Sequence, residues 1–108
     1  MFINYTNHPS DAWGEKQRAE ASKYGEILDI HFPDISPQMT VHEMNEFVKG
    51  ETEKIIALVK SDDPSAVLCQ GESGFTYMLV NSLLNKKLSA HRWESGLRNL
   101  KVVSAVSE

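Results

Sequence analysis

The feature that most constrains the fold of this chain is an alternation between short apolar runs and longer amphipathic segments. The short runs are mainly apolar, and most of them are rich in β-branched or aromatic residues, which predicts strands, whereas the segments between them carry apolar residues at helical spacing. Strands are expected at residues 2–6, 26–32, 66–69 and 100–106. This alternation favours an α/β domain with right-handed crossovers, one open and mostly parallel four-stranded sheet, and helices on both faces.

Helices are expected between these strands, at residues 11–24, 41–60 and 75–87. Ser10 is the expected N-cap of the first helix, because its hydroxyl can accept a hydrogen bond from a free amide of the first turn. The second helix begins with a capping box, in which Thr40 and Glu43 each satisfy the backbone amide of the other. Ser73 is one option for the cap of the third helix, and a further short helix is one option for residues 90–94.

Length, charge and composition narrow the class of protein. At 108 residues the chain is expected to form a single domain over residues 1–108. Its formal net charge of −4 disfavours a long nucleic acid as partner, because nonspecific binding needs a broad basic surface. Residues 1–10 carry no basic leader, and no run approaches the roughly 20 apolar residues of a membrane helix. We therefore expect a cytoplasmic protein without a membrane partner.

The sequence indicates no metal or cofactor chemistry. The four histidines are scattered along the chain, and Cys69, the single cysteine, lies in a predicted buried strand. A metal site needs several ligating side chains at matched spacing, so we expect neither a metal nor a cofactor. A single cysteine also rules out an intrachain disulfide, which agrees with a cytoplasmic protein.

The expected strand order places candidate binding residues at one edge of the sheet. We expect a flavodoxin-like order 2-1-3-4, in which strands one and three lie side by side and their helices lie on opposite faces. Ligands of open α/β sheets bind at such a switch point, beyond the carboxyl ends of the strands. The residues expected there are Thr6, Asn7, His8, Pro9 and Ser10 from the first loop and Gln70, Gly71, Glu72, Ser73 and Gly74 from the third, with His31, Ser104 and Ser107 farther along the edge.

Several of these residues suit a phosphate-bearing ligand. Both loops lead into helix N-termini, whose free amides attract anions, and Gly71 and Gly74 would let a ligand approach the backbone closely. The segment matches neither a Walker loop nor the dinucleotide glycine fingerprint. A glycine-containing turn with Ser73 as helix cap is therefore an equal alternative.

His8 and Glu72 are the candidate catalytic residues. His8 could act as a general acid or base because histidine side chains titrate near neutral pH, and local packing or capping is the alternative. Glu72 could act as a base or nucleophile or could bind a ribose hydroxyl, and the alternative is a stabilising negative charge at a helix start. A triad of Ser73, His8 and Asp29 can be drawn, but no nucleophile-elbow motif supports it.

Three segments together form a recognisable layout: residues 7–13, residues 24–33 and the triplet 70–72. Over about residues 1–85 the chain resembles small prokaryotic proteins with a minimal Rossmann-like fold. Among these it looks most like the stand-alone CRISPR-associated proteins related to CARF sensor domains and small ring nucleases. The resemblance implies a homodimer that binds a cyclic oligoadenylate and, in the ring-nuclease members, cleaves it without metal through a ribose 2′-hydroxyl. It also implies ligand contacts from His8, Ser10, Gly71, Glu72 and Ser73.

The sequence leaves three function classes open. The first is a small nucleotide-binding protein, either a cyclic-oligonucleotide sensor or a metal-independent phosphodiesterase. Another is a nucleoside enzyme of the deoxyribosyltransferase kind, with Glu72 as nucleophile. The last is a noncatalytic interaction module that uses the basic stretch of residues 86–101, around Trp93. Its positive charges are Lys86, Lys87, Arg92, Arg98 and Lys101.

Overall fold

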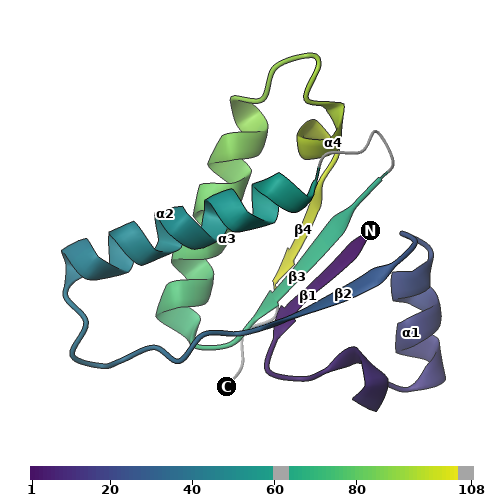
Figure 1. Cartoon of the computed structure of the whole chain (residues 1–108), viewed down its shortest axis with the longest axis horizontal. Coiled ribbons are helices and arrows are strands. Elements are labelled where there is room, and N and C mark those ends of the chain that lie inside the picture. Colours follow the sequence, from purple (N-terminus) through teal and green to yellow (C-terminus); the bar gives the residue numbers. More distant parts are fainter. Residues whose placement is uncertain (60–63, 105–108) are drawn as a thin grey trace.

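The computed structural model describes residues 1–59 and 64–104, and its strands form one parallel sheet. The strands are β1 (Phe2–Thr6), β2 (Ile27–His31), β3 (Ala66–Gln70) and β4 (Lys101–Ser104). Their order is β2-β1-β3-β4 and every neighbouring pair is parallel, which confirms the expected α/β, Rossmann-like arrangement (Figure 1). Three parts of the sequence-based prediction lie outside the described residues: the end of the strand expected at residues 100–106, Ser107, and residue 60 of the expected second helix.

The helical segments that connect the strands lie on both faces of the sheet. They are η1 (Ser10–Ala12), α1 (Glu15–Ser22), α2 (Val41–Leu58), α3 (Ser73–Leu88) and α4 (Ser95–Arg98). Figure 1 shows α2 and α3 crossing each other, with α1 well apart from them beside β2. Among the described residues, no helix combines the length and apolar character that crossing a bilayer requires.

The first long helix begins later than expected, at Glu15. Ser10 starts a single 3-10 turn, after which Trp13 and Gly14 are extended, with ψ angles of 151° and 164°. Ser10 does not cap α1, because its hydroxyl donates a 3.0 Å hydrogen bond to Asp29 on the neighbouring strand. This bond holds the loop against the end of the sheet, so the helix starts only after the extended residues.

Glutamate side chains take part in capping the N-termini of α2 and α3. In α2 the predicted capping box is confirmed: Glu43 N–H donates to Thr40 Oγ1 at 3.1 Å, and Thr40 N–H donates to Glu43 Oε1 at 3.2 Å. The cap of α3 is Glu72, not Ser73, because the extended backbone at Glu72 lets its carboxylate reach back to the first turn. The short helix expected at residues 90–94 is found instead as α4, five residues later.

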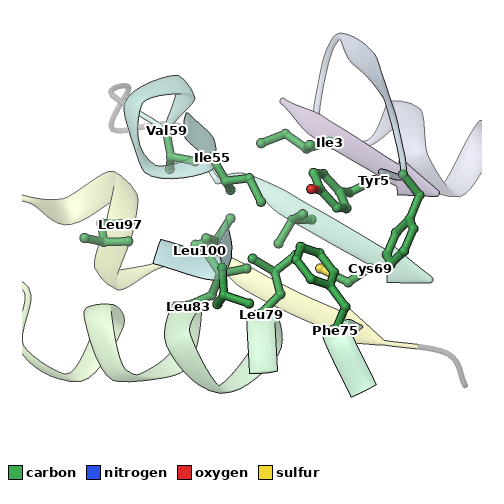
Figure 2. Packing of buried hydrophobic residues seen from close by; sticks show 13 residues of the cluster. Ile3, Tyr5, Ile55, Val59, Cys69, Phe75, Leu79, Leu83, Leu97 and Leu100 are labelled. Carbon is green, nitrogen blue, oxygen red and sulfur yellow. The ribbon is translucent and has the colours of Figure 1, made fainter. Parts of the chain in front are cut away.

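One face of the sheet is covered by α2 and α3, and the buried core lies beneath them. Ile3 and Tyr5 of β1 and Cys69 of β3 point into this core (Figure 2). The helices contribute Val48, Ile55, Phe75, Leu79 and Leu83. Burying a side chain of this size stabilises a fold by roughly 1.5–3 kcal/mol, so this face supplies most of the stability. Burial also raises the pKa of the Cys69 thiol to about 12, which keeps it in its unreactive form.

The opposite face of the same strands is only partly covered. Successive strand residues point to opposite faces, so Phe2, Ala66 and Leu68 lie on the side of α1. That helix has eight residues and buries only Ala21. Phe2 and Leu68 are therefore half-buried, although their neighbours in the sequence on the other face are fully buried. Part of the sheet beside α1 is therefore left uncovered.

Candidate functional site

The carboxyl ends of β1 and β3 lie side by side, as the switch-point hypothesis requires. In the parallel register Thr6 is aligned with Gln70 on one side and with His31 on the other. The loops that follow these residues therefore leave the sheet from one shared edge. The prediction that the loops after β1 and β3 leave the sheet side by side is confirmed.

A network of polar side chains fixes the loop after β1. Asn4 Nδ2 donates to Asp29 Oδ1 at 2.9 Å and to the carbonyl oxygen of His8 at 2.8 Å. Thr6 Oγ1 donates to Asn4 Oδ1 at 2.8 Å, and His8 N–H donates to Thr6 Oγ1 at 3.0 Å. Ser10 completes the network through its backbone and side-chain bonds to Asp29. The backbone of His8 is held while its side chain remains exposed.

Asp29 is the ionic centre of this network. Burial alone would raise the pKa of Asp29, but the hydrogen bonds from Asn4 and Ser10, with the nearby Arg18, outweigh it and hold the pKa below its usual value. The Arg18 guanidinium also donates a hydrogen bond to the carbonyl oxygen of Ser10. Asp29 and Ser10 therefore organise the loop, and Ser10 is buried within it.

A groove opens between this loop, α1 and the uncovered face of the sheet. One cavity, of about 330 Å³, is lined by Thr6, His8, Ala12, Trp13, Gly14, Gln17, Leu68 and Gln70. A second, of about 260 Å³, is lined by Phe2, Glu20, Ala21, Tyr24, Ala66, Lys101 and Val103, together with three residues of the first. The shared residues are Trp13, Gln17 and Leu68, so the two cavities form one continuous depression. We call it the α1 groove.

The two ends of the α1 groove differ in chemistry. Toward the carboxyl edge of the sheet, His8, Gln17 and Gln70 provide polar groups. Toward the other end, three aromatic rings pack together: Phe2 meets Trp13 edge-on with ring centroids 5.8 Å apart, and Tyr24 at 6.0 Å. Such a groove can hold a ligand with a flat apolar part and a polar part.

The loop after β3 is built differently and stands outside the groove. Glu72 Oε1 accepts from Gly74 N–H at 2.8 Å and Glu72 Oε2 accepts from Phe75 N–H at 2.9 Å, so both carboxylate oxygens cap α3. A Cβ placed on Gly71 would lie 2.5 Å from the Phe32 ring, so the ring itself occupies the space that the missing side chain leaves. Helix capping and close packing are the roles that this geometry supports.

The structure thus separates residues that the sequence had grouped. Of the predicted residues, Thr6, His8 and Gln70 line the α1 groove, whereas Ser73 and Ser104 line a different cavity between α3 and β4. Asn7 and His31 are exposed near the shared edge, and Gly71, Glu72 and Gly74 form the start of α3. Across residues 1–59 and 64–104, no three His, Cys, Asp or Glu side chains gather as a metal site.

Sequence reasoning missed the middle of the groove, which consists of Trp13, Gln17 and Leu68. Trp13 lies close after the predicted loop, but it falls within the helix expected at residues 11–24. The alternation of side chains along β3 predicted that Leu68 points away from its core-facing neighbours. Only the length and position of α1 reveal that this side chain is left uncovered.

Comparison with known proteins places the chain in a family. No curated protein and no solved structure gives a significant match. A family match, by contrast, covers residues 1–95, which include all of the α1 groove except Lys101 and Val103. Because the match extends over most of the chain, we conclude that this protein belongs to the Uncharacterized protein MJ1673 family.

Proposed function

We propose that this protein binds a nucleotide, or a similar small molecule that joins a flat ring to a phosphate, in the α1 groove. The observation that carries the proposal is the groove itself, which runs from an aromatic, mostly apolar end, also lined by Glu20 and Lys101, to a polar end at the carboxyl edge of the sheet. Open α/β sheets bind their ligands at this edge, next to the switch in strand order. The proposal therefore rests on shape and chemistry together.

The middle of the groove suits a base. A heterocycle placed between Trp13 and Leu68 would cover apolar surface that the protein leaves half-exposed. Stacking of a base on an aromatic side chain is worth about 1–3 kcal/mol. Gln17 and Gln70 carry amide groups that both donate and accept, which matches the mixed hydrogen-bonding edge of a base.

The start of α1 suits a phosphate. Gly14 is its N-cap and lines the groove, and none of the described side chains caps the helix there. The first amides of a helix have no partner within the helix, and its dipole favours an anion at this end. Glu15 adds a negative charge in the same turn, but its side chain is exposed, where solvent screens it. The start of α3 is less suitable, because the Glu72 carboxylate already occupies it.

Any reaction on the ligand would depend on His8. Its side chain lines the groove and is exposed, whereas both oxygens of Glu72 are used in capping. A metal-independent phosphodiesterase, or a sensor of cyclic oligonucleotides that works as a homodimer, is the more specific form of this proposal. The deoxyribosyltransferase alternative requires Glu72 as a free nucleophile and is not favoured by this geometry.

Trp13 provides a direct test, because the chain has only one other tryptophan. Trp93→Phe leaves Trp13 as the single reporter, and its fluorescence is followed during titration with AMP, ATP and a cyclic oligoadenylate. We expect saturable quenching with at least one of them and a rise in melting temperature, since a ligand at a hundred times its Kd adds about 2.7 kcal/mol of stability. Cleavage of the cyclic oligoadenylate, detected by chromatography, would show that the protein is also a catalyst.

The control for this test is a second exposed histidine. His8→Ala should weaken binding by about five- to tenfold, whereas His42→Ala, at the start of α2 and outside the groove, should not change it. Identical affinities for the two variants, or no response to any nucleotide at millimolar concentration, would rule the proposal out.

A second candidate function is supported by a different surface. Leu88 and Trp93 are 86% and 78% exposed, and Trp93 stacks on a neighbouring histidine with ring centroids 4.6 Å apart. Arg92 and Arg98 are exposed in the same stretch. Exposed apolar residues beside positive charge are typical of protein interfaces. For a noncatalytic interaction module, Arg92→Glu with Arg98→Glu should abolish capture of a purified acidic partner, whereas His8→Ala should not.

A further inference from the structure

A separate cavity lies between α3 and the end of β4. It has a volume of about 160 Å³ and is lined by Ser73, Thr76, Tyr77, Val80, Asn81 and Ser104. Ser104 is aligned with Cys69, whose side chain lies in the core beneath α3, so this cavity is on the opposite face of the sheet from the α1 groove. No residue lines both. The two sites can therefore be tested independently.

The wall of this cavity contains a buried hydroxyl without a partner. Thr76 is only 4% exposed, and its Oγ1 has no hydrogen bond within the described part of the chain. Burying a polar group without a hydrogen bond is costly, and folded proteins usually avoid it. A threonine on a helix populates two side-chain rotamers, so a rotation about one bond lets the hydroxyl change direction. A ligand in the adjoining cavity could supply the missing hydrogen bond.

The lining residues indicate the chemical class of such a ligand. Four of the six carry hydroxyl groups, Asn81 adds an amide, and Val80 is apolar. None of the six carries a charge, and the carboxylate that caps α3 belongs to Glu72, next to Ser73 in the chain. Hydroxyl and amide groups both donate and accept, whereas most of the exposed lining surface is apolar, which together suit a small ring that carries several hydroxyls and apolar C–H faces rather than an anion. The volume corresponds to about five water molecules.

We infer that this cavity is a second binding site, for a small uncharged polyhydroxylated molecule such as a pentose or a polyol, and that Thr76 is one of its contacts. Thr76 then lowers the stability of the ligand-free protein, because its buried hydroxyl has no hydrogen bond there. The hydroxyl gains a hydrogen-bond partner only when the ligand binds. Stability and binding should respond to the same substitution in opposite directions.

The test is a titration of the folded protein with D-ribose, followed by amide chemical shifts and by melting temperature. Saturable shifts are expected at residues 73, 76, 81 and 104, with no such response to ribose 5-phosphate. Thr76→Val should raise the melting temperature of the free protein, because it removes the unsatisfied group, and should weaken ribose binding about fivefold or more. Unsaturable or absent shifts, or unchanged affinity in Thr76→Val, would overturn the inference.

The matched control is Thr52, a buried threonine of α2 whose hydroxyl is satisfied. It donates to the Val48 carbonyl oxygen at 2.7 Å, and its oxygen is hydrogen-bonded to the Ser82 hydroxyl, with 2.8 Å between Thr52 Oγ1 and Ser82 Oγ. Thr52→Val should therefore lower the melting temperature and leave ribose affinity unchanged. Ser104→Ala, on the strand side of the cavity, is the second test of binding if Thr76→Val does not fold, and full affinity in that variant would count against the site.

Discussion

The two faces of the sheet use the same four strands for different purposes. On the face under α2 and α3, Ile3 and Val67 have no exposure at all, whereas on the face under α1 their sequence neighbours Phe2 and Leu68 are half-buried. The difference comes from the helices, since α2 and α3 have 18 and 16 residues and α1 has eight. One face therefore holds the fold together, and the other retains apolar surface that the helices do not cover.

The largest expected effect compares two leucines that lie on opposite sides of this division. Leu79 of α3 is fully buried, so Leu79→Ala should lower the free energy of unfolding by about 2–5 kcal/mol. Leu68→Ala should cost less than half as much, because water already reaches this side chain. Urea unfolding of both variants measures the difference. Equal losses would mean that the α1 face is as important for stability as the core.

The next comparison concerns glycines in the two loops. Gly71→Ala would place a methyl group 2.5 Å from the Phe32 ring, and because rings in this part of the core pack edge to face, we expect a loss of about 1–3 kcal/mol. Gly14→Ala meets nothing within 4 Å and keeps an ordinary backbone, so its stability should change by less than about 0.5 kcal/mol. A large loss in Gly14→Ala would show that the loop after β1 is as tightly packed as the loop after β3.

The sequence predicts the sheet well, because the signals for it are local and repeated. Apolar runs separated by helical segments place all four strands, and the short connections with right-handed crossovers favour the order that is found. This order aligns Thr6 with Gln70, and it therefore also brings His8 close to a cavity at the same edge. These inferences need only the position of each residue along its strand.

What the sequence does not predict is how far each helix reaches over the sheet. The start of α1 depends on Asp29, which lies 19 residues after Ser10 in the chain and holds the loop through hydrogen bonds that no local pattern shows. The choice of Glu72 over Ser73 as cap depends on the backbone conformation of a single residue. The α1 groove results from these nonlocal choices, which explains why Trp13 and Leu68 were not recognised as part of a site.

A smaller effect is expected from a polar pair that joins β1 to α2. Tyr5 Oη donates to Glu51 Oε1 at 2.6 Å, and Lys54 contacts the other carboxylate oxygen at 2.8 Å. Tyr5→Phe should cost about 1 kcal/mol in urea unfolding, because the buried carboxylate keeps only one of its partners. Burial and the Glu51 carboxylate raise the pKa of Tyr5, so the associated stability should be present below about pH 10 and lost above it. No loss in Tyr5→Phe would mean that the pair is balanced by its desolvation.

The smallest effect is expected at the polar network of the other face, and it should appear at acid pH. The pKa of Asp29 is lower in the folded state, so ionised Asp29 stabilises the fold above the usual aspartate pKa of about 3.9, and this contribution disappears as the pH falls through the folded-state value. Asp29→Asn should lower the melting temperature slightly at pH 7 and flatten its dependence between pH 5 and 2. Asp11→Asn, outside the network, should keep the wild-type dependence. If both variants follow the wild type, the loop after β1 is held by packing alone, and the polar end of the α1 groove would not depend on Asp29.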